Sequence, residues 1–224
     1  CAWRDNGTII GSHDWASQTV LPVVIQAASM RGKVYAAVID NGTVINAGLH
    51  AAVHFDNGTY LVADNLTLNF KYQDNSTHPG IEFRAGKGND NITIVALSGS
   101  PSALILVDNA SVAEGTAGVN AYRMWDNGTL QKQYTGVLNM NNIGSIDAME
   151  GPSNTVYMAV LEDDNGTIGY DNLSVWKTTD YGSSWSNLDE VKLMHATTGS
   201  VSIAVGSSAN DVWVGFNENS IVRL

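Results

Sequence analysis

The stretch around residue 180 most narrows the folds open to this chain, because it reads as a β-hairpin. Residues 173–177 form a short run of side chains that favour strands. Asp180, Tyr181 and Gly182 then give a tight-turn sequence, and Trp185 follows on the return. Strand formers followed by Asp and Gly are typical of two antiparallel strands joined by a short turn. The stretch therefore predicts antiparallel β structure.

The same stretch resembles the Asp-box, a repeat motif of β-propeller proteins. Thr178, Asp180, Gly182 and Trp185 occupy the four defining places of Ser/Thr-x-Asp-x-Gly-x-x-Trp. Asp-boxes recur in the blades of sialidases, sortilin-like receptors and photosystem assembly factors. In that family the motif is a structural turn away from the active site, so the resemblance implies an architecture and not an activity.

A weaker copy of the motif lies upstream. Residues 122–129 align without a gap with residues 176–183, an offset of 54 (176 − 122). This offset is near the length of one propeller blade, about 40 to 50 residues. We predict an all-β fold, with residues 1–224 forming a single domain of antiparallel, propeller-like blades that can belong to a longer chain. The alternative is a β-sandwich subunit that a neighbour's strand completes.

Composition agrees with many short strands joined by tight turns. The chain has 22 Gly but 4 Pro, and charged residues make up 15 %. Only residues 189–196 could make a short helix, and residues 111–119 read as a loop. Strands are predicted at residues 23–25, 33–39, 59–62, 66–72, 81–84, 92–97, 103–107, 143–149, 155–161, 172–178, 184–188, 200–205, 212–216 and 220–224.

The N-glycosylation sequence Asn-x-Ser/Thr is unusually frequent. The chain has 22 Asn and 35 Ser plus Thr in 224 residues. Random order would give roughly three such sequons, whereas ten occur. They are at Asn6, Asn41, Asn57, Asn65, Asn75, Asn91, Asn109, Asn127, Asn165 and Asn172.

Asp precedes every one of these ten Asn and none of the other twelve. Turn chemistry explains the Asp-Asn-Gly cases, but the remaining sequons lack Gly and keep Asp. A modifying enzyme that reads Asp-Asn-x-Ser/Thr covers all ten. Because Asn-glycosylation is chemistry of an exposed, translocated chain, we expect a heavily N-glycosylated extracellular or cell-surface protein.

The net charge of −11 argues against nucleic acid as a partner, because phosphates demand clustered Lys and Arg. No window is apolar enough for a membrane span. The chain begins at Cys1, and two interpretations stay open. Cys1 is either the lipid-carrying residue of a mature lipoprotein or the first residue of a processed or partial chain.

No set of residues predicts catalysis, a metal site or a cofactor. The five Arg are scattered, unlike the arginine triad of sialidases, and the carboxylates show no spacing that selects a pair. His50 and His54 would share one face of a strand, but no third metal ligand is evident. We therefore expect a protein that is not an enzyme.

Three functions remain in competition. The first is a structural or adhesive surface protein that assembles with itself or with other surface proteins. Its contacts would concentrate in residues 174–224, where sequons are missing. The second is a carbohydrate-binding or carbohydrate-active propeller, in which Trp3, Trp15 or Trp125 stacks on sugar rings. The third is an assembly factor anchored through Cys1.

Overall fold

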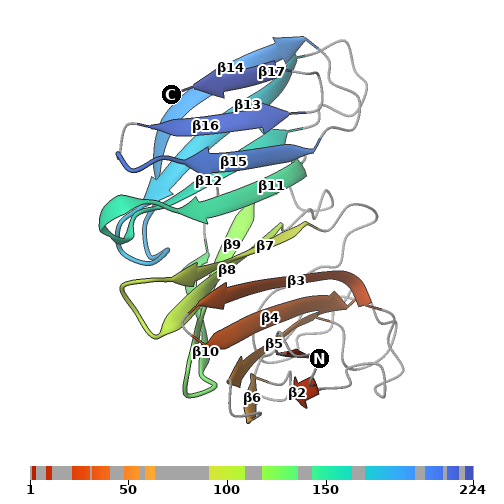
Figure 1. Cartoon of the computed structure of the whole chain (residues 1–224). Helices are drawn as coiled ribbons and strands as arrows, with labels where there is room; N and C mark the ends of the chain where they lie inside the picture. Colours follow the sequence, from red (N-terminus) through yellow and green to blue (C-terminus); the bar gives the residue numbers. More distant parts are fainter. Residues whose placement is uncertain are drawn as a thin grey trace.

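The computed structural model shows an all-β chain of antiparallel sheets (Figure 1). In the described part of the chain, the only helical element is η3, a single 3-10 turn at Pro152–Asn154. The structure describes residues 2–3, 9–11, 22–30, 32–40, 48–55, 59–63, 91–108, 118–135, 143–162, 170–194, 200–208, 211–216 and 220–223.

The strands form successive sheets in which each strand pairs antiparallel with the next one along the chain. Sheet 1 holds β3 (Pro22–Met30), β4 (Lys33–Asp40), β5 (Gly48–Phe55) and β6 (Tyr60–Ala63). Sheet 2 holds β7 (Ile92–Leu97), β8 (Ser102–Asp108), β9 (Val119–Trp125) and β10 (Leu130–Thr135). Sheet 3 holds β11 (Ile143–Glu150), β12 (Val156–Glu162), β13 (Tyr170–Thr178) and β14 (Ser186–Met194).

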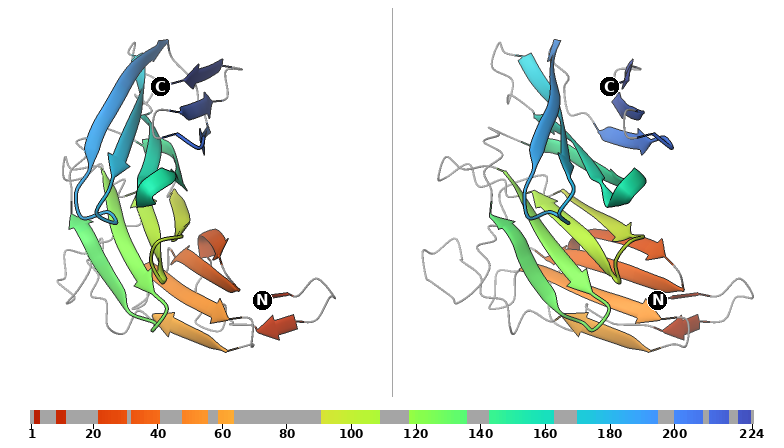
Figure 2. Two further views of the ribbon diagram at one scale, coloured as in Figure 1. Left: turned by 60° about the vertical axis from the view of Figure 1, so that its left-hand side comes forward. Right: turned by 90° about the vertical axis from the view of Figure 1, so that its left-hand side faces the viewer.

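Sheet 4 holds β15 (Val201–Val205), β16 (Val212–Phe216) and β17 (Ser220–Arg223). β1 (Ala2–Trp3) pairs with β2 (Ile9–Gly11) and not with β17. The N-terminal strand therefore does not complete sheet 4 in the described structure. The two ends of the chain lie at opposite ends of the row of sheets (Figures 1 and 2).

One apolar core fills each gap between consecutive sheets. Tyr35 and Val53 of sheet 1 pack against Ile105 and Tyr122 of sheet 2. The next core joins sheets 2 and 3, and a third joins sheets 3 and 4. Alternate residues of a strand point to opposite faces, so a central sheet needs apolar side chains on both. This is why β7, with the sequence ITIVAL, is buried along its whole length.

Side chains of β11 join the first strands of three sheets. Ser145 Oγ accepts the N–H of Val201 at 3.1 Å, and Asp147 Oδ2 accepts that of Ile203 at 2.9 Å. Asp147 Oδ1 also accepts the Thr93 hydroxyl at 3.4 Å. The first strands β3, β7, β11 and β15 are neighbours along the row. Polar side chains thus satisfy backbone groups that no strand partner reaches.

The two copies of the 54-residue repeat lie at the same place in successive sheets. Residues 126–128 form the β9–β10 turn of sheet 2, and residues 180–182 lie in the β13–β14 turn of sheet 3. Gly128 has a φ of 83° and faces Leu61 of sheet 1. Gly182 has a φ of 91° and faces Leu104 of sheet 2. Each turn therefore packs on the preceding sheet.

The predicted all-β class and most predicted strands that fall on described residues are confirmed. The helix predicted at residues 189–196 is wrong, because residues 186–194 form β14 and pair with β13. Strands outside the predicted set include β2, which has three residues, and β5, β9 and β10, in which His, Asn, Arg and Gln interrupt the apolar pattern. The strands predicted at residues 66–72 and 81–84 lie outside the described residues.

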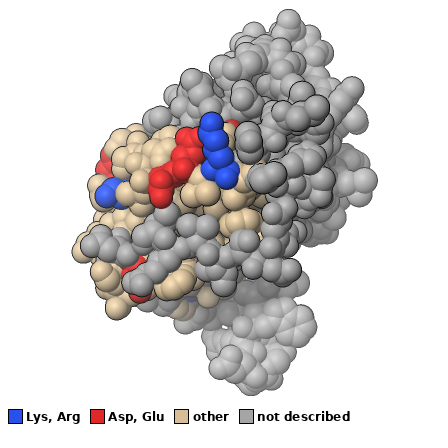
Figure 3. Space-filling model, turned by 90° about the horizontal axis from the view of Figure 1, so that it is seen from above, with Lys and Arg blue, Asp and Glu red and all other residues tan. Residues whose placement is uncertain are grey.

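Among the described strands, the outer strand β14 pairs with β13 alone, and its exposed side chains are mostly polar, although Leu188 is exposed as well. Asp189, Glu190 and Lys192 are exposed along it. Charged side chains on an edge strand discourage pairing with another chain. Seen from above, the described surface shows acidic and basic side chains next to one another and no extended patch of one sign (Figure 3).

Candidate functional site

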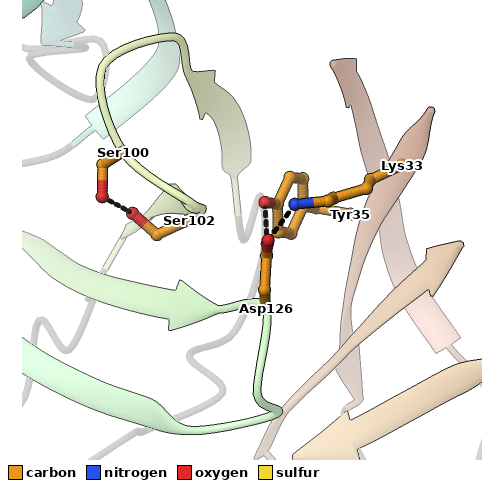
Figure 4. Close-up of polar contacts among 5 residues, drawn as sticks. All are labelled: Lys33, Tyr35, Ser100, Ser102 and Asp126. Atoms are coloured by element: carbon orange, nitrogen blue, oxygen red, sulfur yellow. Dashed lines mark hydrogen bonds and ion pairs between the residues drawn. The ribbon is translucent and has the colours of Figure 1, made fainter. Parts of the chain in front are cut away.

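Two turns of sheet 2 meet the first hairpin of sheet 1 at one end of the sheets. The backbone N–H of Asp126 in the β9–β10 turn donates to the carbonyl of Pro101 in the β7–β8 turn at 3.0 Å. The Asp126 carboxylate accepts hydrogen bonds from the Lys33 ammonium and the Tyr35 hydroxyl, both on β4 (Figure 4). These charged hydrogen bonds fasten sheet 1 to sheet 2.

A pocket of about 190 Å³ lies beside this cluster. β3, β4 and the β7–β8 region provide its lining, which is Met30, Lys33, Tyr35, Leu97, Ser98, Gly99, Ser100 and Pro101. An aromatic ring and aliphatic groups therefore stand next to hydroxyls and an ammonium group. Pockets that combine apolar walls with a few placed polar groups are typical of small-molecule sites. This one is smaller than most, so it suits a single ring and not a large ligand.

Sheet 3 holds the pocket's β7–β8 turn in place. Both carboxylate oxygens of Glu150 accept the backbone N–H of Ser98, at 2.9 and 2.8 Å. Asn154, in η3, has a φ of 60° and lies against Gly99. A Cβ at Gly99 would clash with the end of the Asn154 side chain, so a larger residue there would require that side chain to move. The pocket wall is thus held by residues about 50 positions downstream.

The cluster is arranged to donate hydrogen bonds. Burial, and then the hydrogen bond and charge of Asp126, raise the pKa of Tyr35 well above its ordinary value. Tyr35 therefore stays protonated through neutral pH and cannot act as a base there. The Lys33 ammonium also lies 5.9 Å from the centre of the Phe55 ring. The Lys33 ammonium has N–H donors left for a pocket ligand, whereas the single Tyr35 O–H is engaged by Asp126 and leaves only its oxygen as an acceptor.

Arg123 of β9 binds the β7–β8 turn through Ser100. Its guanidinium carbon is 4.7 Å from the Trp125 ring centre and 4.2 Å from that of Tyr181. Its Nε donates to Ser102 Oγ at 2.9 Å, and its Nη2 donates to Ser100 Oγ at 2.5 Å. The Ser102 hydroxyl donates in turn to Ser100 at 3.0 Å (Figure 4). Ser100 thus belongs both to the pocket and to the surroundings of Arg123.

The four residues of the predicted structural turn lie together at the end of β13. Thr178 Oγ1 donates to Asp180 Oδ1 at 2.7 Å and accepts the Gly182 N–H at 2.9 Å. Asp180 also accepts the Ser184 N–H and hydroxyl, at 2.9 and 2.6 Å. Trp185 packs on the core between sheets 2 and 3. These contacts hold the turn and leave it no reactive group.

The pKa of Asp180 is lowered from its ordinary value. Partial burial by itself would raise this pKa, but the hydrogen bonds from Ser184 and Thr178 favour the carboxylate and outweigh it. The charged form therefore supports the folded turn at neutral pH. This support is lost only as the pH falls through the lowered pKa.

Three of the ten sequon asparagines lie on described residues. Asn127 is exposed in the β9–β10 turn, and its Oδ1 accepts the Thr129 N–H at 3.0 Å. The Nδ2 of Asn91 donates to the Gly144 carbonyl at 3.2 Å. Asn172 is half-buried on β13. The other seven, Asn6, Asn41, Asn57, Asn65, Asn75, Asn109 and Asn165, lie outside the described residues.

The remaining candidates lie apart from the pocket or outside the described structure. Cys1 and Trp15 are not described, and Trp125 is half-buried beneath Arg123. His54 is buried on β5. In the described ranges, no three His, Cys, Asp or Glu side chains gather as a metal site. No helix there is long and apolar enough to cross a bilayer.

Sequence reasoning missed the pocket residues Lys33, Tyr35 and Ser100, and also Glu150. Each is an ordinary surface or strand residue when read alone, and up to 93 positions separate the partners of the ion pair. One signal was available. Asp126 aligns with Asp180 in the repeat, but Met124 stands where Thr178 would cap the carboxylate. An Asp without a local cap in a tight turn is free to accept hydrogen bonds from water or from donors elsewhere in the chain.

Comparison with known proteins gives no sequence relative. No family model matches the chain, and no curated protein matches it. Three solved structures are similar in fold. The polysaccharide lyase Uly1 is 7 % identical with a TM-score of 0.47, over 85 % of this chain and 47 % of that one. An ulvan lyase from a new family of polysaccharide lyases is 13 % identical with a TM-score of 0.48, over 86 % and 51 %.

The third is an N-acetylgalactosamine deacetylase from F. plautii in complex with blood group B trisaccharide. It is 12 % identical with a TM-score of 0.43, over 81 % of this chain and 59 % of that one. The chain thus spans about half the length of these structures. All three are carbohydrate-active enzymes, which contradicts the expectation that this protein is not an enzyme. That expectation is withdrawn.

Proposed function

We propose that this chain is an arc of a β-propeller that recognises a carbohydrate in the pocket between sheets 1 and 2. Four successive meanders whose first strands are neighbours, with Asp-box-like turns packed on the preceding sheet, support the propeller architecture. The pocket carries the functional part of the proposal. It places the ring of Tyr35 beside the hydroxyls of Ser98 and Ser100 and the ammonium of Lys33.

These groups match the chemistry of a sugar ring. Its carbon-bearing faces are apolar and pack on aromatic or aliphatic surface, whereas its hydroxyls both donate and accept hydrogen bonds. Tyr35, Met30 and Pro101 provide the first kind of surface, and Lys33 and the serines provide the second. Binding of a carbohydrate is also the first step of any carbohydrate-active enzyme. The proposal therefore applies to a carbohydrate-binding protein and to a carbohydrate-active enzyme alike.

Filling the pocket tests this proposal. Ser98 is exposed and lines the pocket, and its backbone N–H donates to Glu150. In Ser98→Trp, the indole should occupy the cavity and reduce saccharide affinity at least tenfold, about 1.4 kcal/mol. Isothermal titration against a panel of neutral and acidic oligosaccharides measures it.

Ser207→Trp is the matched control, because Ser207 is exposed in the β15–β16 turn, away from the pocket. It should bind as the wild type does. Equal affinities of the Ser98 and Ser207 variants for every bound saccharide would place the binding site elsewhere.

The sequons support a second proposal, that the protein is an extracellular or cell-surface glycoprotein. Asn127 is the most suitable described site, because it is exposed in a turn and its oxygen, not its nitrogen, receives the Thr129 hydrogen bond. Asp126 also has a structural role, because it binds Lys33 and Tyr35. The fold therefore explains the Asp that precedes this sequon, whether or not a modifying enzyme recognises that Asp.

Glycopeptide mapping of natural material should find Asn127 more fully occupied than Asn91. Glycan attaches to the amide nitrogen, and the Asn91 nitrogen is engaged with Gly144. The exposed, non-sequon Asn187 is the control and should be bare. Equal occupancy of Asn127 and Asn91 would show that folded contacts do not govern the modification. Bare asparagine at both would contradict the glycoprotein proposal at these sites.

A further inference from the structure

Arg123 is a cation without a carboxylate partner in the described structure. The ion pair between Lys33 and Asp126 does not involve it. Arg123 is half-buried and donates to two neutral hydroxyls instead, those of Ser100 and Ser102. A guanidinium group has more donors than these two bonds use. Charge that is partly removed from water and left unpaired is costly unless something compensates it.

The contacts of Arg123 leave the outer edge of its guanidinium group for a compensating anion. The rings of Trp125 and Tyr181 lie over its plane, at 4.7 and 4.2 Å from the guanidinium carbon. Ser100 and Ser102 take the Nη2 and Nε sides. This packing holds the guanidinium in one orientation. A guanidinium held in this way is suited to planar or tetrahedral oxyanions.

The site is continuous with the pocket through one residue. Ser100 lines the pocket and also accepts the Arg123 hydrogen bond. A ligand seated against Ser100 on the pocket side thus has Arg123 next to it. The net charge of −11 gives the protein no general attraction for acidic ligands. Any preference for them must arise at a local cation such as this one.

We propose that Arg123 and Ser100 bind the anionic group of an acidic saccharide whose neighbouring sugar occupies the pocket. The group is a carboxylate or a sulfate ester, which share the oxyanion chemistry that a guanidinium recognises. This inference rests on the proposed function, because it assumes that the pocket takes a sugar. It adds that the ligand is acidic and names the residue that selects it.

The test compares three tetrasaccharides at constant ionic strength: a uronic-acid tetrasaccharide, its carboxyl-reduced neutral counterpart and a sulfated tetrasaccharide. The wild type should bind at least one acidic ligand ten times more tightly than the neutral one. Whichever acidic ligand shows the preference identifies the group. Arg123→Gln should lower the affinity for that acidic ligand to the level of the neutral one, so that the preference disappears.

Two further variants separate charge at this site from charge in general. Arg123→Lys keeps the charge but loses the planar, stacked geometry, so it should retain only part of the preference. Lys177→Gln is the matched control, because Lys177 aligns with Arg123 in the repeat and lies one sheet further along. It removes the same charge and should leave the preference intact. Circular dichroism melting curves establish that each variant is folded.

Each outcome bears on a different claim. Equal affinity of the wild type for acidic and neutral ligands would overturn this inference and leave the carbohydrate pocket standing. So would a preference that survives in Arg123→Gln or disappears in Lys177→Gln. If Arg123→Gln does not fold, Arg123→Lys decides: a full wild-type preference in that variant overturns the guanidinium site. Absence of binding to all three ligands would overturn the proposed function together with this inference.

Discussion

Asp147→Ala is expected to lower the free energy of unfolding by about 3 kcal/mol, because hydrogen bonds to a charged group are worth about 1.5 to 3 kcal/mol each. Asp147 accepts the N–H of Ile203 at 2.9 Å and the hydroxyl of Thr93 at 3.4 Å. Its carboxylate thus touches sheets 2 and 4 from a strand of sheet 3. Removing it leaves the Ile203 N–H on a buried residue without its acceptor.

Chemical denaturation measures this loss, and a fall in melting temperature of roughly 6 to 12 °C should accompany it. Asp189→Ala is the control. Each carboxylate accepts the N–H of its own following residue at 2.9 Å, Ala148 for Asp147 and Glu190 for Asp189. Asp189 is exposed on β14, and this local bond is the one described for its carboxylate. Its removal should cost less than about 0.5 kcal/mol. Equal losses would mean that the bonds between sheets contribute nothing.

Asp147 also shows what the sequence can and cannot reveal. The strands themselves were predictable, since β-branched runs such as residues 92–97 end at Gly, Ser or Asp whatever surrounds them. The two Asp-x-Gly turns were predictable for the same local reason. Which face each strand buries depends on the neighbouring sheets. Asp147 reads as a solvated acid in the sequence, and only the packing of three first strands makes it a bridge.

The error at β14 has the same origin. Residues 189–196 carry side chains that suit a short helix, and nothing local forbids one. The backbone instead pairs with β13, with Asp189 opposite Val175 and Val191 opposite Leu173. Pairing with an existing sheet outweighs a weak helical preference, because propensity is a small term beside packing and the ladder of hydrogen bonds.

The candidate site was the least predictable part. The pocket needs Lys33 from sheet 1, Ser100 from sheet 2 and the support of Glu150 from sheet 3. None of these residues belongs to a motif, and their spacing follows no pattern that a single sequence exposes. The Asp-x-Gly turn was the best indication of the site in the sequence, because its carboxylate accepts hydrogen bonds from nearby donors. In one copy Thr178 supplies a donor locally, whereas in the other Asp126 finds Lys33 and Tyr35 on another sheet.

The turn glycines give the second large prediction, in which Gly182→Ala should destabilise the fold by about 3 kcal/mol. Gly182 has a φ of 91°, a conformation that costs a residue with a Cβ about 1 kcal/mol or more. An added Cβ would also lie 2.8 Å from Leu104 Cδ1 and 3.3 Å from Ala121 Cβ, both buried on sheet 2. Overpacking of a core adds about 1 to 3 kcal/mol.

Two other glycines distinguish backbone strain from overpacking of the core. Gly128 shares the positive φ, at 83°, but its Cβ would lie 3.1 Å from Cβ of Leu61, a residue that is 40 % exposed and not part of the buried core. Gly128→Ala should therefore cost about 1 to 2 kcal/mol, mostly backbone strain. Gly215 on β16 has no positive φ and nothing within 4 Å of an added Cβ. Gly215→Ala should be neutral or stabilise by up to about 1 kcal/mol, through the lost freedom of the unfolded chain. The ranking from urea denaturation tests the repeat directly: a Gly182 variant no less stable than the Gly215 variant would mean that the β13–β14 turn does not pack on sheet 2.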